Sequence, residues 1–519
     1  MKWVVAELHM HNGCTVPTAI NVRKEIMKFR KANLLSIPAL IVGLCLMFVD
    51  MVTAQTFTTL HSFTGGDGDG PQAGLTTSGV TLYGAADSGG SFGFGTVFKI
   101  NTNGTGFTTL TNFDGNGNGA YPDGTMVLAG ATLYGTAYYG GTSDNGTVFK
   151  VDTNGTGFSI VHNFTTTTGL NSTNSDGANP EFGLILSGST LYGTTETGGT
   201  SGFGTVYKVN TNGTGFTTLH SFTSGSDGET PQTLLMSGNT LYGITTSFFS
   251  GNGTVFKINT NGSSYAILHT FTITNFAGFP NGGPTPAPNY TNSGGALPSS
   301  LTLIGNTLYG TTFYGGTSGN GTVFKMNTDG TGFTTVYNFA ASSTNSAGVF
   351  TNSTGTHPIQ FTGLVLSGST LYGAAAYGGN AGNGTIFGIN TNGTGFTTMH
   401  SFTVTDLGGA NSDGGNPFGG LILSGNTLYG TTQIGGTLGF GTLFSVALSQ
   451  QPSLAIIRSG TNVVLTWSTN VSGFTLQSTT NIASPSVWAT VTPAPVVVGG
   501  QNTVTNANSG TKKFYRLIQ

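Results

Sequence analysis

Residues 204–222 read Gly-Thr-Val-Tyr-Lys-Val-Asn-Thr-Asn-Gly-Thr-Gly-Phe-Thr-Thr-Leu-His-Ser-Phe. Alternating apolar and polar residues flank a central Asn-Gly, which predicts two antiparallel strands joined by a tight turn. Each half of this stretch occurs seven times along the chain, and so does a third element, Thr-Leu-Tyr-Gly. A fixed repeat of roughly 50 residues indicates a propeller or a solenoid.

One repeat contains four predicted strands, at residues 184–186, 190–195, 204–210 and 216–222. A lone fourth strand, residues 57–63, precedes the first repeat, and the last repeat stops after its third strand at residues 441–446. A ring closed by its N-terminal strand needs this arrangement, whereas a solenoid would need capping repeats. The sequence therefore predicts an all-β fold, in which residues 55–450 form a seven-bladed β-propeller closed by the N-terminal strand.

The composition agrees with an all-β protein. Of 519 residues, 86 are Gly and only 6 % are charged, yet Phe, Tyr, Leu and Val recur at fixed places, which disorder does not produce. No helical periodicity of apolar residues follows residue 55.

Residues 1–54 have the features of a leader. Lys28, Arg30 and Lys31 precede an apolar run at residues 34–49, and residues 52–54 form a small-residue cleavage signal. This pattern predicts a secretory signal peptide that is removed, with an uncleaved anchor as the alternative. Both cysteines lie in this segment, so the mature protein would contain none. We expect a secreted or cell-surface protein without a stable membrane span.

The motifs Leu-Tyr-Gly-Thr-Thr, Gly-Thr-Val-Phe-Lys, Asn-Gly-Thr-Gly and Leu-His-Ser-Phe resemble the GloVer tandem repeat of secreted bacterial proteins, notably of Verrucomicrobia. The resemblance covers residues 57–446 and is specific because it recurs seven times. It implies export and a C-terminal sorting or anchoring region, and it supplies no site residues.

The repeat stops at Pro452, and residues 451–519 carry short alternating segments with two Trp and no Cys. Strand-and-turn spacing over this length predicts a small β-sandwich, similar to fibronectin-type or immunoglobulin-like modules. The basic C-terminal tail is consistent with a sorting or attachment module.

The charge of the predicted propeller is acidic. Residues 55–450 contain 5 Lys, no Arg and 15 Asp or Glu. Nucleic acid is therefore not expected as a partner, because its phosphate backbone requires a basic surface. We expect a monomer that recognises a polysaccharide or a cell-surface protein.

Irregular loops between the fourth strand of one repeat and the first strand of the next share a face with the loops between strands two and three. Variable loops on a rigid scaffold are where binding sites usually lie. Aromatic residues in or beside these loops do not repeat and are our candidate binding residues: Tyr121, Tyr138, Tyr139, Phe248, Phe249, Tyr290, Phe313, Tyr314 and Tyr377, with Phe276 and Phe279 nearby.

Residues 114–119, Asp-Gly-Asn-Gly-Asn-Gly, match the first half of a calcium-binding loop. Asp114, Asn116 and Asn118 would offer alternating side-chain oxygens to a hard cation. The expected bidentate Glu is absent, and Thr125 stands in its place. A structural Ca²⁺ site and a Gly-rich turn both remain open, and no other cofactor is expected.

Other chemistry-bearing residues repeat with the blades. Five His at one position of the fourth strand, five Lys on the third strand and seven Tyr on the second strand are interpreted as packing or solvated strand positions. Residues 89–93 match Gly-x-Ser-x-Gly, but no helix follows, so a nucleophile elbow is not expected.

Three functional hypotheses follow. We favour an exported, non-enzymatic binding or adhesion protein whose propeller loop face recognises a polysaccharide or surface partner. The first alternative is a polysaccharide-active lyase or hydrolase. The second is a structural surface repeat protein, stabilised by calcium. Fold alone does not decide between them.

Overall fold

The computed structural model describes residues 55–247, 252–272, 291–346, 348–358, 363–448, 454–468, 474–480, 487–507 and 513–518. Contacts divide the chain into two compact units. Residues 55–450 form the larger unit, and residues 451–519 belong to the smaller unit, with which residues 1–54 are grouped. The described residues are all-β, and none of them forms a helix long and apolar enough to cross a membrane.

The described part of the larger unit contains seven four-stranded antiparallel sheets. Six of them use four consecutive strands: β2 (Thr76–Ser78), β3 (Thr81–Ala86), β4 (Thr96–Asn101) and β5 (Thr108–Asn112); β6 (Val127–Ala129), β7 (Thr132–Ala137), β8 (Thr147–Asp152) and β9 (Ser159–Asn163); β10 (Ile185–Ser187), β11 (Thr190–Thr195), β12 (Thr205–Asn210) and β13 (Thr217–Ser221); β14 (Pro231–Ser237), β15 (Thr240–Ser247), β16 (Asn252–Asn259) and β17 (Ala266–Phe271); β18 (Asn292–Ile304), β19 (Thr307–Gly316), β20 (Thr322–Asn327) and β21 (Thr334–Asn338); β24 (Val365–Ser367), β25 (Thr370–Ala375), β26 (Thr385–Asn390) and β27 (Thr397–Ser401).

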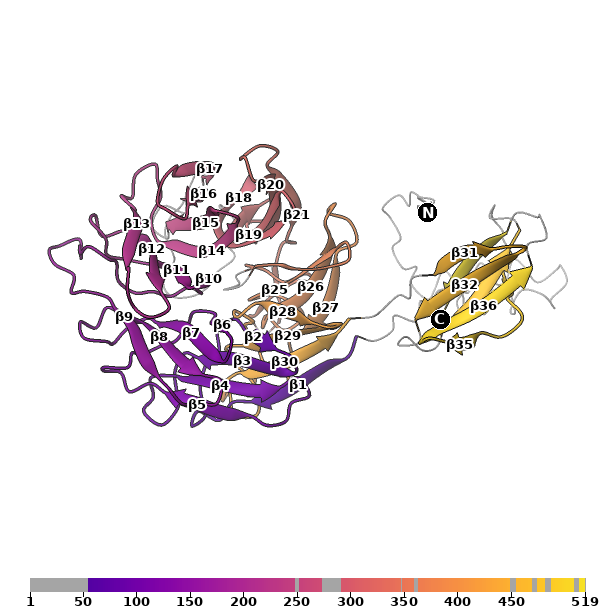
Figure 1. Cartoon of the computed structure of the whole chain (residues 1–519), viewed down its shortest axis with the longest axis horizontal. Coiled ribbons are helices and arrows are strands. Elements are labelled where there is room, and N and C mark those ends of the chain that lie inside the picture. The colour runs from indigo at the N-terminus through magenta and orange to yellow at the C-terminus, as the bar shows by residue number, and fades with distance from the viewer. Residues whose placement is uncertain are drawn as a thin grey trace. The chain divides into compact units, whose positions relative to one another are not determined.

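The seventh sheet combines the two ends of this unit. Strand β1 (Phe57–Ser62) pairs antiparallel with β30 (Thr442–Ala447), which is followed across the sheet by β29 (Thr427–Thr432) and β28 (Leu421–Ser424). The arrangement is propeller-like, because the first strands β6, β10 and β14 lie toward the middle and the fourth strands β9, β13 and β17 lie toward the outside (Figure 1).

The repeat keeps one register in its sheets. Tyr192 on β11 lies opposite Lys208 on β12, and the pairing of β12 with β13 shifts between Val206 and Tyr207. The same shift recurs between the third and fourth strands of other sheets. The shift increases local twist, as β-bulges do, and it recurs because the sequence recurs.

The hydrophobic core lies between neighbouring sheets. Tyr192 of the third sheet packs in one cluster with Leu241 and Phe256 of the fourth, and corresponding clusters join the other neighbours. Burial of apolar side chains between sheets is the main stabilising term for such a fold, because each sheet alone exposes both faces.

A glycine–proline contact also recurs between neighbouring sheets. A Cβ added to Gly95, just before β4, would lie 2.5 Å from Cδ of Pro122, which precedes the first strand of the next sheet. The same contact joins Gly146 to Pro180 and Gly384 to Pro417. The glycine that opens each Gly-Thr-Val-Phe segment is therefore required by the proline of the following repeat.

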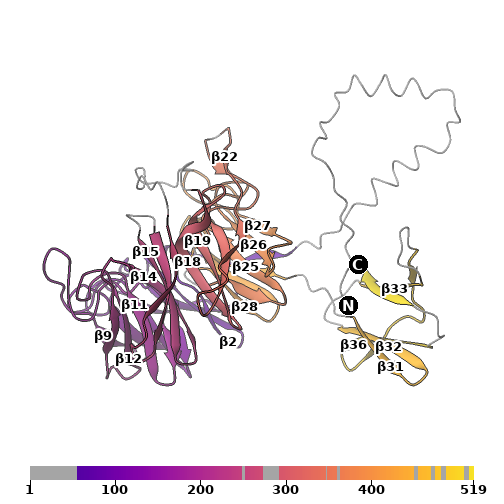
Figure 2. The same ribbon diagram turned by 90° about the horizontal axis from the view of Figure 1, so that it is seen from above.

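One repeat carries an insertion. Strands β22 (Ser343–Thr344) and β23 (Phe350–Thr351) form a small hairpin between β21 and β24, and β22 projects from the larger unit in Figure 2. This hairpin has no counterpart among the described residues of the other six sheets.

The smaller unit contains two sheets in its described part. Their strands are β31 (Ala455–Ser459), β32 (Asn462–Ser468), β36 (Gln501–Ala507) and β35 (Val496–Val498) in one sheet, and β34 (Ala489–Thr490), β33 (Thr475–Thr479) and β37 (Phe514–Ile518) in the other. Leu465 and Trp467 of the first sheet share a buried cluster with Leu476 of the second. Arg516 stacks over Trp488 at 4.3 Å from the ring centroid and donates to Oε1 of Gln477.

Candidate functional site

Each repeat enters its first strand through a residue in the left-handed region, followed by proline. Six of these residues are not glycine, and their φ lies between 49° and 59°: Tyr121, Asn179, Thr230, Leu297, His357 and Asn416. This conformation is uncommon for residues with a side chain and must be held by surrounding contacts. The N–H of Tyr138, just after β7, donates to the carbonyl of Tyr121 at 3.0 Å, and the N–H of Glu196 donates likewise to Asn179 at 2.9 Å.

This turn brings two positions of every repeat side by side, one after the proline and one at the third residue beyond Thr-Leu-Tyr-Gly. The first position holds Gln72, Asp123, Glu181, Gln232, Ser299 and Phe418, and its remaining member, residue 359, lies outside the described residues. The second position holds Asp87, Tyr138, Glu196, Thr246, Phe313, Ala376 and Gln433. A constant backbone therefore presents a different pair of side chains in each repeat.

Four carboxyl groups from the first three repeats gather here, and we call them the acidic arc: Asp87, Asp123, Glu181 and Glu196. The carboxyls of Asp87 and Asp123 act on each other's pKa. The phenol of Tyr138 donates to Oε2 of Glu196 at 2.5 Å. Charges on Glu196 and Asp87 also act on Glu181. The arc is thus one electrostatically connected group.

Burial raises the pKa values of the four carboxyls in this arc. Burial, followed by the nearby charges of Asp87 and Glu181, raises the pKa of Asp123 well above its usual range. Burial, followed by the charges of Glu196 and Asp87, raises the pKa of Glu181 to about 8. The pKa values of Asp87 and Glu196 are also raised, mainly by burial. All four carboxyls therefore hold their protons to higher pH than free carboxyls do, and Glu181 can donate a hydrogen bond at neutral pH.

Oδ1 of Asp123 is buried and has no hydrogen-bond partner among the described residues. Buried polar atoms are normally paired, because an unpaired atom loses its hydration without replacement. An unpaired oxygen within a group of perturbed carboxyls is typical of a functional site.

Three of the predicted aromatic residues lie together beside this arc. The rings of Tyr138 and Tyr139 meet edge to face with centroids 4.6 Å apart, and Tyr121 lies 6.0 Å from Tyr139. Tyr139 is 42 % exposed, so its ring is accessible from solvent. Burial, followed by the charge of Glu196, raises the pKa of Tyr138, so its hydroxyl stays protonated.

Three further predicted residues gather around His357. Phe313, Tyr314 and Tyr377 place their ring centroids 4.6, 5.1 and 5.8 Å from the imidazole. Tyr314 is buried with Ala296 in a small core cluster, so it supports this group from within. The remaining predicted aromatics, Phe248, Phe249 and Tyr290, lie outside the described residues, as do Phe276 and Phe279.

None of the four carboxyls of the acidic arc is among the residues predicted from the sequence. The signal that would have found them is a register comparison of the repeats. A carboxyl occupies at least one of the two positions in each of the first three repeats, and none occupies either position among the described residues of the last four.

The loop proposed for calcium uses its side chains locally. The N–H of Asn116 donates to Oδ1 of Asp114 at 2.9 Å, and the N–H of Asp114 donates to Oδ1 of Asn118 at 2.8 Å. These bonds are those of the Gly-rich turn, and calcium binding stays a prediction. Within the described ranges, no group of three or more His, Cys, Asp or Glu side chains is arranged to hold a metal ion.

The repeated histidines connect neighbouring sheets. Nε2 of His162 lies 3.0 Å from Oδ2 of Asp176, and its ring stacks at 3.8 Å on Phe216 of the next sheet. The amide and hydroxyl of Thr165 donate to the same carboxylate. Equivalent His–Asp pairs occur at His61, His220 and His400. This geometry agrees with their interpretation as packing residues.

Repeated four-stranded sheets with variable residues on one face define an all-β, propeller-like tandem-repeat protein. Residues 46–175, 166–287 and 285–479 match the model of the Gloeobacter/Verrucomicrobia repeat family. Because these matches cover most of the sequence, the chain belongs to that family.

No curated protein matches the sequence. Among solved structures, the chain is similar at 12 % identity to an oligogalacturonate lyase in complex with manganese, over 76 % of this chain and 93 % of that one, with a TM-score of 0.45. It is similar at 9 % identity to a puromycin-hydrolysing peptidase of Mycobacterium tuberculosis, over 76 % of this chain and 57 % of that one, with a TM-score of 0.43. A chain of the nidogen/laminin complex shares 12 % identity over 62 % of this chain and 92 % of that one, with a TM-score of 0.35. At these scores the likeness says nothing about function.

Proposed function

We propose that the seven sheets close into a seven-bladed β-propeller whose last blade is completed by β1. Three kinds of contact support closure. A core cluster joins Leu82 of the first sheet to Tyr429 of the seventh, and another joins the sixth sheet to the seventh. Gly441 lies against Pro71 as in the other repeats, and Phe57 on β1 stacks on His400 at 3.8 Å.

We further propose that the protein is exported and that residues 451–519 act as an attachment or sorting module. The leader pattern at residues 1–54 and the absence of Cys after residue 45 support export. The two sheets that share one core in residues 451–519 are compatible with an immunoglobulin-like or fibronectin-type sandwich.

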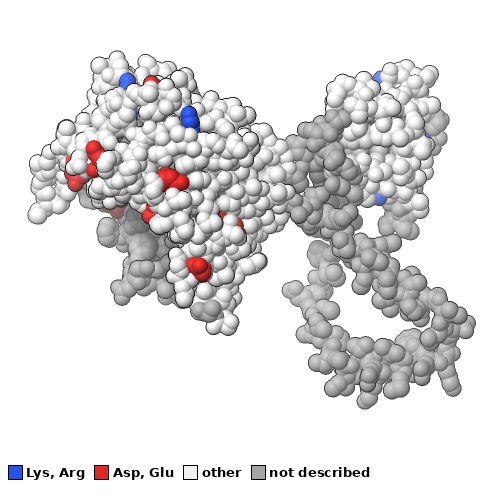
Figure 3. Space-filling model, turned by 90° about the horizontal axis from the view of Figure 1, so that it is seen from below, with Lys and Arg blue, Asp and Glu red and all other residues white. Residues whose placement is uncertain are grey.

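The function we propose for the larger unit is binding of a neutral polysaccharide on its loop face. The acidic arc carries this proposal. Carboxylates, a carboxamide and a phenol offer the acceptors and donors that sugar hydroxyls need, and the neighbouring tyrosines offer ring faces. An anionic polysaccharide is disfavoured, because residues 55–450 contain no Arg and only 5 Lys. Acidic patches outnumber basic ones on the face shown in Figure 3.

Retention on insoluble polysaccharides tests this function. We expect the purified protein to be retained on neutral matrices such as cellulose or chitin and not on cross-linked pectate. Asp87→Asn and Glu196→Gln each replace a carboxyl oxygen by an amide nitrogen and should weaken retention up to about tenfold, since a hydrogen bond contributes about 0.5–1.5 kcal/mol.

Asp329→Asn is the matched control for those two variants. It removes one carboxylate from an exposed hairpin turn and restores the Asn that other repeats carry there. If the arc variants are retained as strongly as this control, the acidic arc is not part of the binding surface. Absence of retention on every neutral matrix would refute the proposed function.

Hydrolysis of the polysaccharide is the second candidate function, and one observation favours it. Burial raises the pKa of Glu181 to about 8, whereas its neighbour Glu196, whose pKa is also raised by burial, accepts a hydrogen bond from Tyr138 that lowers its pKa. A protonated and an ionised carboxyl are the two groups that glycoside hydrolysis uses. Released reducing sugars, abolished by Glu181→Gln, would establish hydrolysis, and retention without release would exclude it for that substrate.

A further inference from the structure

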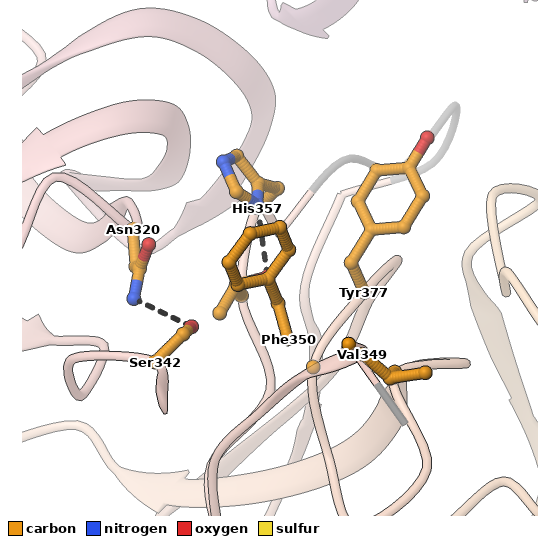
Figure 4. A pocket seen from close by; sticks show the side chains of 10 residues that line it. Asn320, Ser342, Val349, Phe350, His357 and Tyr377 are labelled. Atoms are coloured by element: carbon orange, nitrogen blue, oxygen red, sulfur yellow. Dashed lines mark hydrogen bonds between the residues drawn. The ribbon is translucent and has the colours of Figure 1, made fainter. Parts of the chain in front are cut away.

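A pocket of about 250 Å³ lies where the fifth and sixth sheets meet, whereas the acidic arc belongs to the first three repeats. Figure 4 shows six of the residues that line it: Asn320, Ser342, Val349, Phe350, His357 and Tyr377. At ~30 Å³ per water, the volume has room for about eight waters, or for one six-membered sugar ring.

The insertion hairpin creates this pocket. Phe350 opens β23 and Val349 precedes it, and both side chains line the pocket as its apolar wall. A Cβ added to Gly382 would lie 2.5 Å from Cγ1 of Val349, so glycine is needed there for the hairpin to approach. Other repeats also have glycine at the position of Gly382, whereas the β22–β23 hairpin occurs in this repeat alone among the described residues.

Hydrogen-bonding groups line the opposite wall. Nδ2 of Asn320 donates to Oγ of Ser342 at 3.2 Å, and Nδ1 of His357 lies 2.8 Å from Oγ1 of Thr356. No described residue makes a hydrogen bond to Nε2 of His357 or to the hydroxyl of Tyr377. Within the described part of the pocket, these two polar groups therefore have no protein partner.

The pocket is uncharged. None of the residues that line it is Asp, Glu, Lys or Arg. Burial lowers the pKa of His357 to about 3, so the imidazole is neutral at physiological pH. An anion would find no positive partner here and a cation no negative one, which leaves a neutral polar ligand.

We propose that this pocket binds a single neutral sugar ring at the end of a polysaccharide chain or branch. Phe350 and Val349 contact the apolar face of the ring, and Nε2 of His357 and the hydroxyl of Tyr377 bond its hydroxyl groups. This inference rests on the proposed function and names the part of the polysaccharide that this second site recognises.

Two conservative variants test the pocket. His357→Asn places the residue that the equivalent left-handed positions 179 and 416 already carry, so the turn should be kept. Tyr377→Phe removes only the hydroxyl. Tyr429→Phe is the control, because Tyr429 lies in the core between the seventh and first sheets, whereas the pocket lies between the fifth and sixth.

The ligand probes are methyl glucoside, methyl galactoside and methyl mannoside, titrated into the full protein by calorimetry. We expect millimolar binding of at least one, weakened about three- to tenfold in each pocket variant and unchanged in Tyr429→Phe. In protein labelled with ¹⁵N-histidine, the bound glycoside should shift the Nε2 resonance that His357→Asn removes.

The outcomes separate this inference from the proposed function. Retention on polysaccharide without binding of any of the three glycosides overturns the pocket and leaves the acidic arc in place. If both pocket variants bind a glycoside as tightly as the wild type, the pocket is likewise overturned and the acidic arc stays in place. Failure of both retention and glycoside binding overturns the pocket together with the proposed function.

Discussion

Replacing Phe57 by alanine tests whether the ring is closed. Phe57 lies on β1 and stacks on His400 of the sixth sheet at 3.8 Å, and it also contacts Phe402 and Phe444. Its counterpart Phe107, just before β5, stacks on His61 at the same distance. In a closed ring these two rings occupy equivalent interfaces, and their truncation must have equivalent effects.

The magnitude follows from burial. Truncation of a fully buried Phe costs about 3–5 kcal/mol, and each aromatic pair adds about 0.5–1.5 kcal/mol to burial alone. Both Phe57 and Phe107 are half-buried, so we expect about 2–3 kcal/mol from each. For a unit of roughly 400 residues that loss lowers the Tm by about 3 °C.

Differential scanning calorimetry of the full protein measures this change. Phe57→Ala and Phe107→Ala should lower the transition of the larger unit by the same amount. If Phe107→Ala lowers the Tm and Phe57→Ala leaves it unchanged, β1 is not part of the folded ring in solution, and the reasoning for closure is wrong.

Three further predictions concern single positions. The pKa of Glu181 is higher in the folded protein, about 8, than in the unfolded chain, so its stabilising contribution is complete below the unfolded-state pKa and is lost as the pH rises toward 8. Glu181→Gln should therefore have a higher Tm than the wild type at pH 8 and the same Tm at pH 4. Thermal melts followed by circular dichroism measure this difference. Calcium should leave the Tm unchanged, because Asp114 and Asn118 already accept backbone N–H groups, and a rise of several degrees on adding calcium after chelation would establish the metal site instead. Gly95→Ala should lower the free energy of unfolding by more than about 2 kcal/mol, because the new Cβ would clash with a proline and the backbone φ of +99° disfavours a side chain. Gly79→Ala is the control, because Gly79 also has a positive φ but open space around it, and it should cost about 1 kcal/mol. Chemical denaturation measures both changes.

The all-β fold and its four-stranded units could be predicted because the repeat signals are local. Asn-Gly turns and alternating residues predict strands at residues 190–195 and 204–210, and the structure has them at Thr190–Thr195 and Thr205–Asn210. Membership of the repeat family, expected from the same motifs, is confirmed. The reason for the invariant Gly of Gly-Thr-Val-Phe was not visible in the sequence, since its partner is a proline in the following repeat.

The candidate site could be predicted only in part. Searching for residues that do not repeat found Tyr138 and Tyr377, which the structure places beside the arc and in the pocket. That search worked because aromatic residues are conspicuous in loops. It missed Glu181 and Glu196, because a carboxyl next to Pro or after a strand looks solvated until the turn that buries it is known.

The structure explains why this repeat can carry different sites on one backbone. Proline fixes the approach to each first strand, the glycine of the preceding repeat makes room for it, and a main-chain hydrogen bond joins the two variable positions. Stability therefore depends on positions that recur, and the side chains at the variable pair can change without loss of the scaffold. Carboxyls occur at that pair in the first three repeats, and an uncharged pocket lies where the fifth and sixth sheets meet. In the proposed function, these are two kinds of sugar-binding chemistry on one scaffold. We propose that a single extended polysaccharide binds to the acidic arc along its length and to the pocket at its end. Variants at one of the two sites would then weaken binding without abolishing it.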